Sequence, residues 1–229
     1  MKNSLNKHQV ERFSRQLTLK NIGPKGQKKI LSSKILIVGV GGLGCPAAES
    51  LVRAGIGSIG LIDSDIVNLS NIHRQNLFNS KDVKKFKVNV AAKKLKEINP
   101  LTKIKTYKSK LNVKNIENII KNYELIIDGS DNFKTKFLIN DYCIKFKKKL
   151  ITGAISKFDG HIFTFNFKDK KTASLKSFYQ EKEISDDILN CEFEGVLGTT
   201  ATIVGTTQAN EALKMIMEIG QNLKNQILI

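Results

Sequence analysis

The clearest chemical signal in this sequence is a glycine-rich turn, Gly39-Val40-Gly41-Gly42-Leu43-Gly44. Its glycines have the spacing G-x-G-x-x-G, and they lie between an apolar stretch over 34–39 and a helical pattern over 42–54. Glycines in this position let backbone N–H groups approach phosphate oxygens closely, and the dipole of the following helix favours negative charge. The four glycines of the turn therefore predict a site for nucleotide phosphates.

An acidic strand end follows the turn by about one crossover of a βαβ unit. Asp63 ends the next predicted strand, where an acid commonly accepts hydrogen bonds from ribose hydroxyls. NAD and ATP share this ribose, so Asp63 does not distinguish between them. Asp65 comes two residues later, and the sequence leaves open whether it contacts the nucleotide or caps the following turn.

The next segment, Ser70-Asn71-Ile72-His73-Arg74-Gln75, does not belong to an ordinary dinucleotide site. The guanidinium of Arg74 can bind phosphate oxygens in a bidentate way and can stabilise charge on a leaving pyrophosphate. Asn71 can orient the same phosphates, and Ser70 and Gln75 are further candidate contacts. Beside a phosphate-binding turn, this segment indicates nucleotidyl transfer in place of redox chemistry.

A third strand end carries Asp128-Gly129-Ser130-Asp131-Asn132, at the same carboxyl edge of the predicted sheet. Ligands bind along this edge in open α/β folds. Asp131 offers the hard oxygen ligands that suit a Mg²⁺ ion bridging triphosphate oxygens, and Asn132 is a neighbouring candidate contact. Alternatively, Asp131 caps the helix predicted over 132–146, and one side chain can serve both purposes.

The elements that must position these residues alternate between strand and helix. Short apolar runs predict strands over 34–39, 58–63, 104–107, 125–128 and 150–152. Helices are predicted between them over 42–54, 82–98, 113–121 and 132–146. This alternation predicts an α/β fold of the Rossmann type, a doubly wound and mostly parallel sheet with helices on both faces.

The two ends of the chain extend this core. An amphipathic pattern predicts a helix over 7–20. After Gly160 the pattern predicts a C-terminal antiparallel extension, with a strand over 161–167, a long mobile crossover loop over 168–195, a helix over 199–219 and a last strand over 226–229. We expect a single domain over 1–229, made of N-terminal helices (1–32), a nucleotide-binding core (33–153) and a C-terminal lobe (154–229).

Composition excludes several classes of protein. With 229 residues, 41% of them hydrophobic, the chain is long enough for one domain with a real core. No stretch approaches the roughly 20 apolar residues of a membrane span, and the N-terminus lacks the core of a signal peptide, so we expect a cytoplasmic protein. Three cysteines without a C-x-x-C pair indicate neither a disulfide framework nor a zinc knuckle.

The formal net charge of +17 raises the question of a nucleic-acid partner. The lysines are spread over the whole chain and form no basic stripe with interleaved aromatic residues. Abundant lysine, isoleucine and asparagine fit a coding bias toward A/T-rich codons. We therefore do not expect nucleic-acid binding, although a basic surface also attracts an acidic protein through long-range steering.

Taken together with Arg12-Phe13-Ser14-Arg15-Gln16 near the N-terminus, these motifs resemble the MoeB/ThiF/HesA family, which is related to the ubiquitin-activating enzymes. The resemblance runs from about residue 8 to the end of the chain. It implies ATP-dependent adenylation, with Mg²⁺, of the C-terminal glycine of a small ubiquitin-like sulfur-carrier protein ending in Gly-Gly. Such carriers supply sulfur for thiamine, molybdopterin or related cofactors.

The resemblance also implies roles for individual residues. Asp63 would hold the ribose, Asn71, Arg74 and Lys87 would bind the phosphates, Asp131 would bind Mg²⁺, and Arg15 would reach across a homodimer into the partner's ATP site. This changes the interpretation of Lys87, because its spacing within the helix predicted over 82–98 alone indicates a surface lysine. The lobe over 154–229 would bind the carrier.

The chain departs from the family at its cysteines. Many members bind a structural zinc through two C-x-x-C pairs, but Ser174-Leu175-Lys176-Ser177 stands where the first pair would be, and Ile229 is reached before the second. No zinc is expected, and sulfur would come from a separate donor protein. Cys191 aligns with a cysteine that links covalently to the carrier in some members. A reactive thiol and a loop cysteine without a role are both open for it.

Three other functions compete with carrier adenylation. A tRNA threonylcarbamoyladenosine dehydratase-like enzyme has the same fold, and the net charge nominally supports it. An NAD-dependent oxidoreductase leaves Arg74, Lys87 and Asp131 without a shared purpose. A non-catalytic module that keeps ATP to stabilise an interface fits the absent zinc motif, but not the full set of ATP-binding residues.

Overall fold

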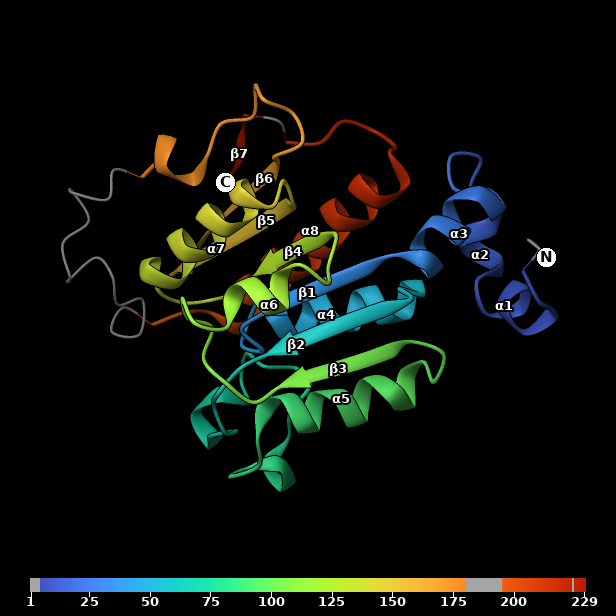
Figure 1. Cartoon of the computed structure of the whole chain (residues 1–229). Helices are drawn as coiled ribbons and strands as arrows, with labels where there is room; N and C mark the ends of the chain where they lie inside the picture. The colour runs from blue at the N-terminus through green and yellow to red at the C-terminus, as the bar shows by residue number, and fades with distance from the viewer. Residues whose placement is uncertain (1–4, 180–194, 224) are drawn as a thin grey trace.

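The computed structural model describes residues 5–179, 195–223 and 225–229. There the chain forms one seven-stranded sheet in the order β3-β2-β1-β4-β5-β6-β7 (Figure 1). The strands are β1 (Lys34–Val38), β2 (Ser58–Ile62), β3 (Lys103–Tyr107), β4 (Leu125–Asp128), β5 (Lys149–Ser156), β6 (Asp159–Asn166) and β7 (Ile227–Leu228). The first five strands run parallel, and β6 and β7 are antiparallel to their neighbours.

The central strands are apolar because both of their faces are covered. In β1 and β4 every residue after Lys34 is buried, which is typical of a parallel strand between two helical layers. The strand order reverses between β1 and β4, and ligands bind at such a switch point in doubly wound folds. The Rossmann-like, doubly wound and mostly parallel sheet with a C-terminal antiparallel extension is confirmed.

The described part of the chain forms helices near its N-terminus and helices on both faces of the sheet. They are α1 (Lys7–Arg12), α2 (Ser14–Leu17), α3 (Gly23–Ser32), α4 (Gly44–Ala54), α5 (Lys87–Ile98), α6 (Ile116–Ile120), α7 (Phe133–Lys145) and α8 (Gly198–Met217). Figure 1 shows α6 and α7 in front of the sheet and α4 and α8 behind it. One hydrophobic core joins α4, α5 and α8 to the sheet, and a second joins α6 and α7 to it.

Helix α5 begins at Lys87, later than the start at residue 82 that the sequence predicted. The residues before it form a 3₁₀ helix over Ser80–Asp82 and then a turn, after which Phe86 pairs antiparallel with Ile66. Backbone hydrogen bonds around Val67 hold this pairing. Tertiary pairing therefore overrides the local helical pattern here.

The helix predicted over 7–20 is divided into α1 and α2 at Phe13. The Phe13 ring is buried and packs against Gly55, which ends α4 in the left-handed conformation with φ of 94°. After this contact the chain continues through α2 into α3, which leads into β1. Helices α1 to α3 lie beyond the end of the sheet where the parallel strands begin (Figure 1).

The loop predicted over 168–195 is described only in part. Residues 168–179 form turns and a short 3₁₀ helix, Leu175–Ser177, and 180–194 lie outside the described residues. In the part of the chain that the structure describes, no helix is long and apolar enough to cross a membrane. The cytoplasmic location and the division into helices, core and lobe stay predictions.

Candidate active site

A cleft of about 780 Å³ lies at the carboxyl ends of the parallel strands. Its walls come from the ends of β1, β2, β4 and β5 and from the loops that follow them. Most of the site residues predicted from the sequence line it: Gly39, Gly41, Gly42, Asp63, Asp65, Asn71, Arg74, Gln75, Lys87, Asp131 and Asn132. The fold therefore brings the three predicted strand ends together around one space.

The glycine turn after β1 packs closely against the turn after β4. Gly39 has φ of +86°, and a Cβ there would be 2.8 Å from the carbonyl oxygen of Gly129. A side chain at Gly44 would collide with the carbonyl oxygen of Gly39, so Gly44 closes the turn without lining the cleft. Gly41 is less crowded, since a Cβ there would make only an ordinary contact with Gln75 Nε2 at 3.8 Å.

Asp63 joins the ends of the first two strands. Its Oδ2 accepts a hydrogen bond from the backbone N–H of Val40, and its Oδ1 accepts one from the N–H of Asp65, both at 2.8 Å. Burial raises the pKa of Asp63 above its ordinary value, and the ammonium of Lys87 opposes that rise. The carboxylate lies just past the carboxyl end of β2, where ribose hydroxyls are bound in this type of fold.

Lys87 is buried, with its side chain 7% exposed, and it lines the cleft. Its Nζ forms an ion pair with Asp65 Oδ2 at 2.9 Å, and its backbone N–H donates to the carbonyl oxygen of Asp65 at 3.0 Å. The surface position that helical spacing alone indicated for Lys87 is therefore wrong. The pairing of Phe86 with Ile66 brings the first residue of α5 to the loop after β2.

A 3₁₀ turn over Leu69–Asn71 precedes Arg74 and sets its direction. Arg74 Nη1 donates to the carbonyl oxygen of Ser70 at 3.1 Å and lies 2.7 Å from Nε2 of His73. A Cβ at Gly42 would be 3.6 Å from Arg74 Cδ, so the arginine side chain lies along the glycine turn. Ser70 thus contributes its backbone to Arg74 and is not itself a lining residue.

The turn after β4 carries Asp131 and Asn132. The N-cap of α7 is Asn132, whose Oδ1 accepts a hydrogen bond from the N–H of Thr135 at 2.9 Å, so the capping role considered for Asp131 is wrong. Asn132 Nδ2 donates to Oδ1 of the exposed Asp131 at 3.1 Å. Over residues 5–179, 195–223 and 225–229, no group of three or more His, Cys, Asp or Glu is placed to hold a metal ion.

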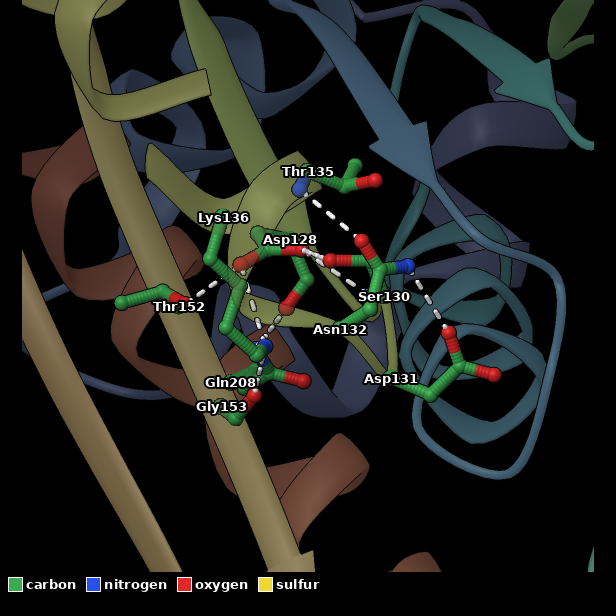
Figure 2. A network of polar contacts seen from close by, with 9 residues as sticks. All are labelled: Asp128, Ser130, Asp131, Asn132, Thr135, Lys136, Thr152, Gly153 and Gln208. Atoms are coloured by element: carbon green, nitrogen blue, oxygen red, sulfur yellow. Dashed lines mark hydrogen bonds and ion pairs between the residues drawn. The ribbon is translucent and has the colours of Figure 1, made fainter. Parts of the chain in front are cut away.

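A buried polar network beneath the cleft was not predicted from the sequence (Figure 2). Its centre is Asp128, which is 1% exposed at the end of β4. Asp128 Oδ2 accepts from Lys136 Nζ at 3.2 Å and from Thr152 Oγ1 at 2.5 Å. Its Oδ1 accepts from the N–H of Ser130 at 2.9 Å and from Ser130 Oγ at 2.5 Å.

The same network reaches β5 and α8. Lys136 Nζ also donates to the carbonyl oxygen of Gly153 at 2.6 Å, and Gln208 Nε2 donates to the carbonyl oxygen of Asp128 at 2.9 Å. One sequence signal was available, because a charged residue at the end of the apolar strand Leu125–Asp128 requires a partner. The sequence does not identify which of its many lysines is that partner.

Residues 13–229 match the ThiF family. This chain belongs to the ThiF family. The assignment agrees with the resemblance that the motifs carry.

Curated relatives of this ThiF-family chain are named as adenylyltransferases. The chain is 39% identical over 226 residues to a probable molybdopterin-synthase adenylyltransferase of Gracilaria tenuistipitata var. liui. This alignment covers 99% of the chain and 63% of that protein. It is 35% identical to a sulfur carrier protein adenylyltransferase of Thermus thermophilus, covering 97% of this chain and 83% of that protein. An adenylyltransferase and sulfurtransferase MOCS3 of Drosophila willistoni is 38% identical, and the chain spans 48% of its length.

Solved structures share the fold of this ThiF-family chain. A crystal structure of E. coli MccB with ATP has a TM-score of 0.82 at 21% sequence identity, covering 97% of this chain and 68% of that one. A crystal structure of PaaA has a TM-score of 0.80 at 22% identity, covering 97% of this chain and 69% of that one. At these identities the likeness concerns the fold.

One predicted catalytic residue, Arg15, is not brought into the cleft of this ThiF-family chain. Arg15 is exposed on α2, which is held near the end of α4 by a hydrogen bond from Gln16 Nε2 to the carbonyl oxygen of Ala54 at 3.3 Å. That position is at the opposite end of the sheet from the cleft (Figure 1). Cys191 lies outside the described residues. Cys45 is a buried packing residue at the start of α4, and burial raises the pKa of its thiol to about 12.

Replacing Lys87 with methionine should raise the pKa of Asp63 further. Burial already disfavours the ionised carboxylate, and the Lys87 ammonium is the strongest opposing influence on it. Without that positive charge the carboxyl keeps its proton to a higher pH. Carboxyl ¹³C NMR titration measures the change.

Lys94→Met is the matched control, because Lys94 pairs with Asp82 at 2.5 Å and lies outside the cleft lining. It should leave the titration of Asp63 unchanged. An unchanged or lowered pKa of Asp63 in the Lys87 variant would contradict the account of this strand end.

Proposed function

We propose that this chain adenylates the C-terminal glycine of a small ubiquitin-like sulfur-carrier protein ending in Gly-Gly, using ATP and Mg²⁺. The observation that carries the proposal is one cleft in which a glycine turn is joined by Arg74, Lys87 and Asp131. Relatives named as molybdopterin-synthase and sulfur carrier protein adenylyltransferases support the choice of acceptor. The carboxylate-activating reaction would serve thiamine, molybdopterin or related cofactor synthesis.

The residues of the cleft fit ATP. The uncrowded backbone at Gly41 lines the cleft, and Asp63 offers a carboxylate for the ribose. Gln75 is 3% exposed, and its Oε1 has no hydrogen-bond partner within the described part of the chain. A buried acceptor of this kind requires a donor, so the floor of the cleft suits a polar ligand.

In the proposed reaction, a carboxylate oxygen of the carrier's terminal glycine attacks the α-phosphorus of ATP. The new oxygen–phosphorus bond makes a mixed anhydride, the bond from the α-phosphorus to the bridging oxygen of the β-phosphate breaks, and pyrophosphate leaves with that electron pair. No protein side chain forms a covalent bond, so catalysis requires alignment and stabilisation of charge. We assign the phosphates to Asn71, Arg74 and Lys87, and we leave Cys191 out of this step.

Asp131 fits the role of a magnesium ligand when phosphate oxygens complete the coordination. A lone carboxylate with bound phosphates is a common way for proteins to hold this ion. When bound, Mg²⁺ supplies positive charge that offsets the charge on the departing phosphates. A hydrogen bond of 3.1 Å from Asn132 Nδ2 to Asp131 Oδ1 orients the Asp131 carboxylate.

A homodimer would complete the site with Arg15 of the partner subunit. The exposed position of Arg15, at the far end of its own sheet, supports a role in a second copy. The carrier tail would enter past the C-terminal lobe, because Ile155, Ser156 and His161 line the cleft beyond the glycine turn. The carrier-binding assignment of residues 154–229 belongs to this proposal.

The net charge of +17 favours one alternative, a tRNA threonylcarbamoyladenosine dehydratase-like enzyme. It would use the same ATP cleft and activate a carboxylate on tRNA. A non-catalytic ATP-binding module would also fit this cleft. The dehydratase-like enzyme would turn over ATP with tRNA as acceptor, and the module would bind ATP without turnover.

ATP–pyrophosphate exchange tests the proposal. With Mg²⁺ and a Gly-Gly carrier from the same organism, exchange should depend on the carrier. The exchange rate should fall by at least about 100-fold in Arg74→Ala or Asp131→Ala. The first change removes a positive charge from the leaving pyrophosphate, and the second removes the proposed ligand of the Mg²⁺ ion that offsets its charge. Lys93→Ala, which removes an exposed lysine on α5, should keep the wild-type rate.

Other outcomes would exclude a residue's role or favour another function. Wild-type exchange in folded Asp131→Ala would exclude the metal role of Asp131. ATP hydrolysis that tRNA stimulates, without carrier-dependent exchange, would favour the dehydratase. ATP binding without turnover for any acceptor would favour the non-catalytic module.

Mixing Arg15→Ala with Arg74→Ala protomers should restore activity that each variant lacks alone. In a mixed dimer one site has lost both arginines and the other keeps both. An equal mixture should recover about a quarter of wild-type exchange, because half of the dimers are mixed and one site in each is intact. No recovery, with mixed dimers demonstrated by native mass spectrometry, would count against a shared site.

A further inference from the structure

A buried ion pair lies directly beneath the proposed nucleotide site. Asp128 at the end of β4 and Lys136 in the first turn of α7 have side chains 1% and 6% exposed, with Nζ 3.2 Å from Oδ2. Lys136 also borders the cleft. Removing two charges from water costs free energy that well-packed apolar side chains would not cost. The pair therefore has a reason beyond filling the core.

The ion pair fixes four elements against one another. Thr152 from β5 donates to Asp128 Oδ2 at 2.5 Å, and Lys136 from α7 donates to the carbonyl oxygen of Gly153 at 2.6 Å. Gln208 from α8 donates to the carbonyl oxygen of Asp128 at 2.9 Å. A side chain at Gly153 would press on Gln208, since a Cβ there would be 2.8 Å from Nε2. The end of β4 thus has little freedom to move.

The second carboxylate oxygen of Asp128 extends this order to Asp131. It accepts both the N–H and the hydroxyl of Ser130, at 2.9 and 2.5 Å, and Asp131 is the next residue. Side-chain contacts join Asp128 to Ser130, Asp131 to Asn132, Asn132 to Thr135 and Lys136 to Asp128 (Figure 2), and the backbone from Ser130 to Asp131 and from Thr135 to Lys136 completes a ring. Asp131 is the exposed member of this ring.

We propose that Lys136 and Thr152 are positioning residues for Mg²⁺-ATP. They act through Asp128, which holds the turn that carries Asp131 in one conformation. This inference rests on the proposed ATP site and adds the side chains that prepare it. Partners that orient a metal ligand typically change metal affinity or activity by 10- to 100-fold when they are removed.

The test is calorimetric titration of ATP into the purified protein, once with Mg²⁺ and once with EDTA. Thr152→Val removes one donor to Asp128 at nearly constant shape, and Lys136→Met removes the cation. In both variants the gain in ATP affinity that Mg²⁺ provides should shrink, by roughly 10- to 100-fold in Lys136→Met. Lys136→Arg should restore most of that gain, because arginine can donate to both Asp128 Oδ2 and the carbonyl oxygen of Gly153, the two acceptors of Lys136.

Lys94→Met is the matched control, because it removes a lysine that pairs with Asp82 away from the cleft. It should lower the melting temperature and leave the Mg²⁺-dependent gain at the wild-type value. If Lys136→Met does not fold, Thr152→Val decides the question.

A wild-type gain in folded Thr152→Val and Lys136→Met would overturn the proposal, as would a wild-type protein whose ATP affinity does not respond to Mg²⁺. The binding result is separate from the adenylation proposal. If wild type binds Mg²⁺-ATP but no carrier supports exchange, the proposed function fails and the positioning role of the ring stands or falls on the titrations alone.

Discussion

The rest of the site depends on the carboxylate of Asp63. It accepts the backbone N–H groups of Val40 and Asp65, both at 2.8 Å, and so ties the glycine turn after β1 to the loop after β2. Burial raises its pKa, and the ammonium of Lys87 favours the ionised form. Because Asp65 binds Lys87 at 2.9 Å, one carboxylate sets the distance between the glycine turn and a cationic side chain of the cleft.

A similar arrangement occurs at the end of β4. Asp128 Oδ1 accepts the N–H of the residue two positions later, as Asp63 Oδ1 does, which is the bonding pattern of an Asx turn. A lysine from the following helix supplies the positive charge in each case, Lys136 for the one and Lys87 for the other. The two turns lie on either side of β1, so together they place polar groups along the edge of the sheet where the cleft lies.

The sheet and most cleft residues could be predicted because local patterns encode them. Apolar runs mark buried parallel strands, and residues at their carboxyl ends meet at one edge. The start of α5 could not be predicted, because the pairing of Phe86 with Ile66 joins segments distant in sequence. The position of Lys87 follows from that pairing, so spacing alone misplaced it. The partner of Asp128 is decided by how α7 packs on β4, which a lysine-rich sequence does not reveal.

Intact-mass analysis of a Gly-Gly carrier, after incubation with this protein, ATP and Mg²⁺, tests the central claim most directly. Adenylation predicts a carrier bearing one AMP, formed at the terminal carboxylate and absent from a carrier that lacks its last two residues. Hydroxylamine should convert that product to a carrier hydroxamate with release of AMP. A carrier that stays unmodified under conditions in which the protein binds ATP would contradict the account.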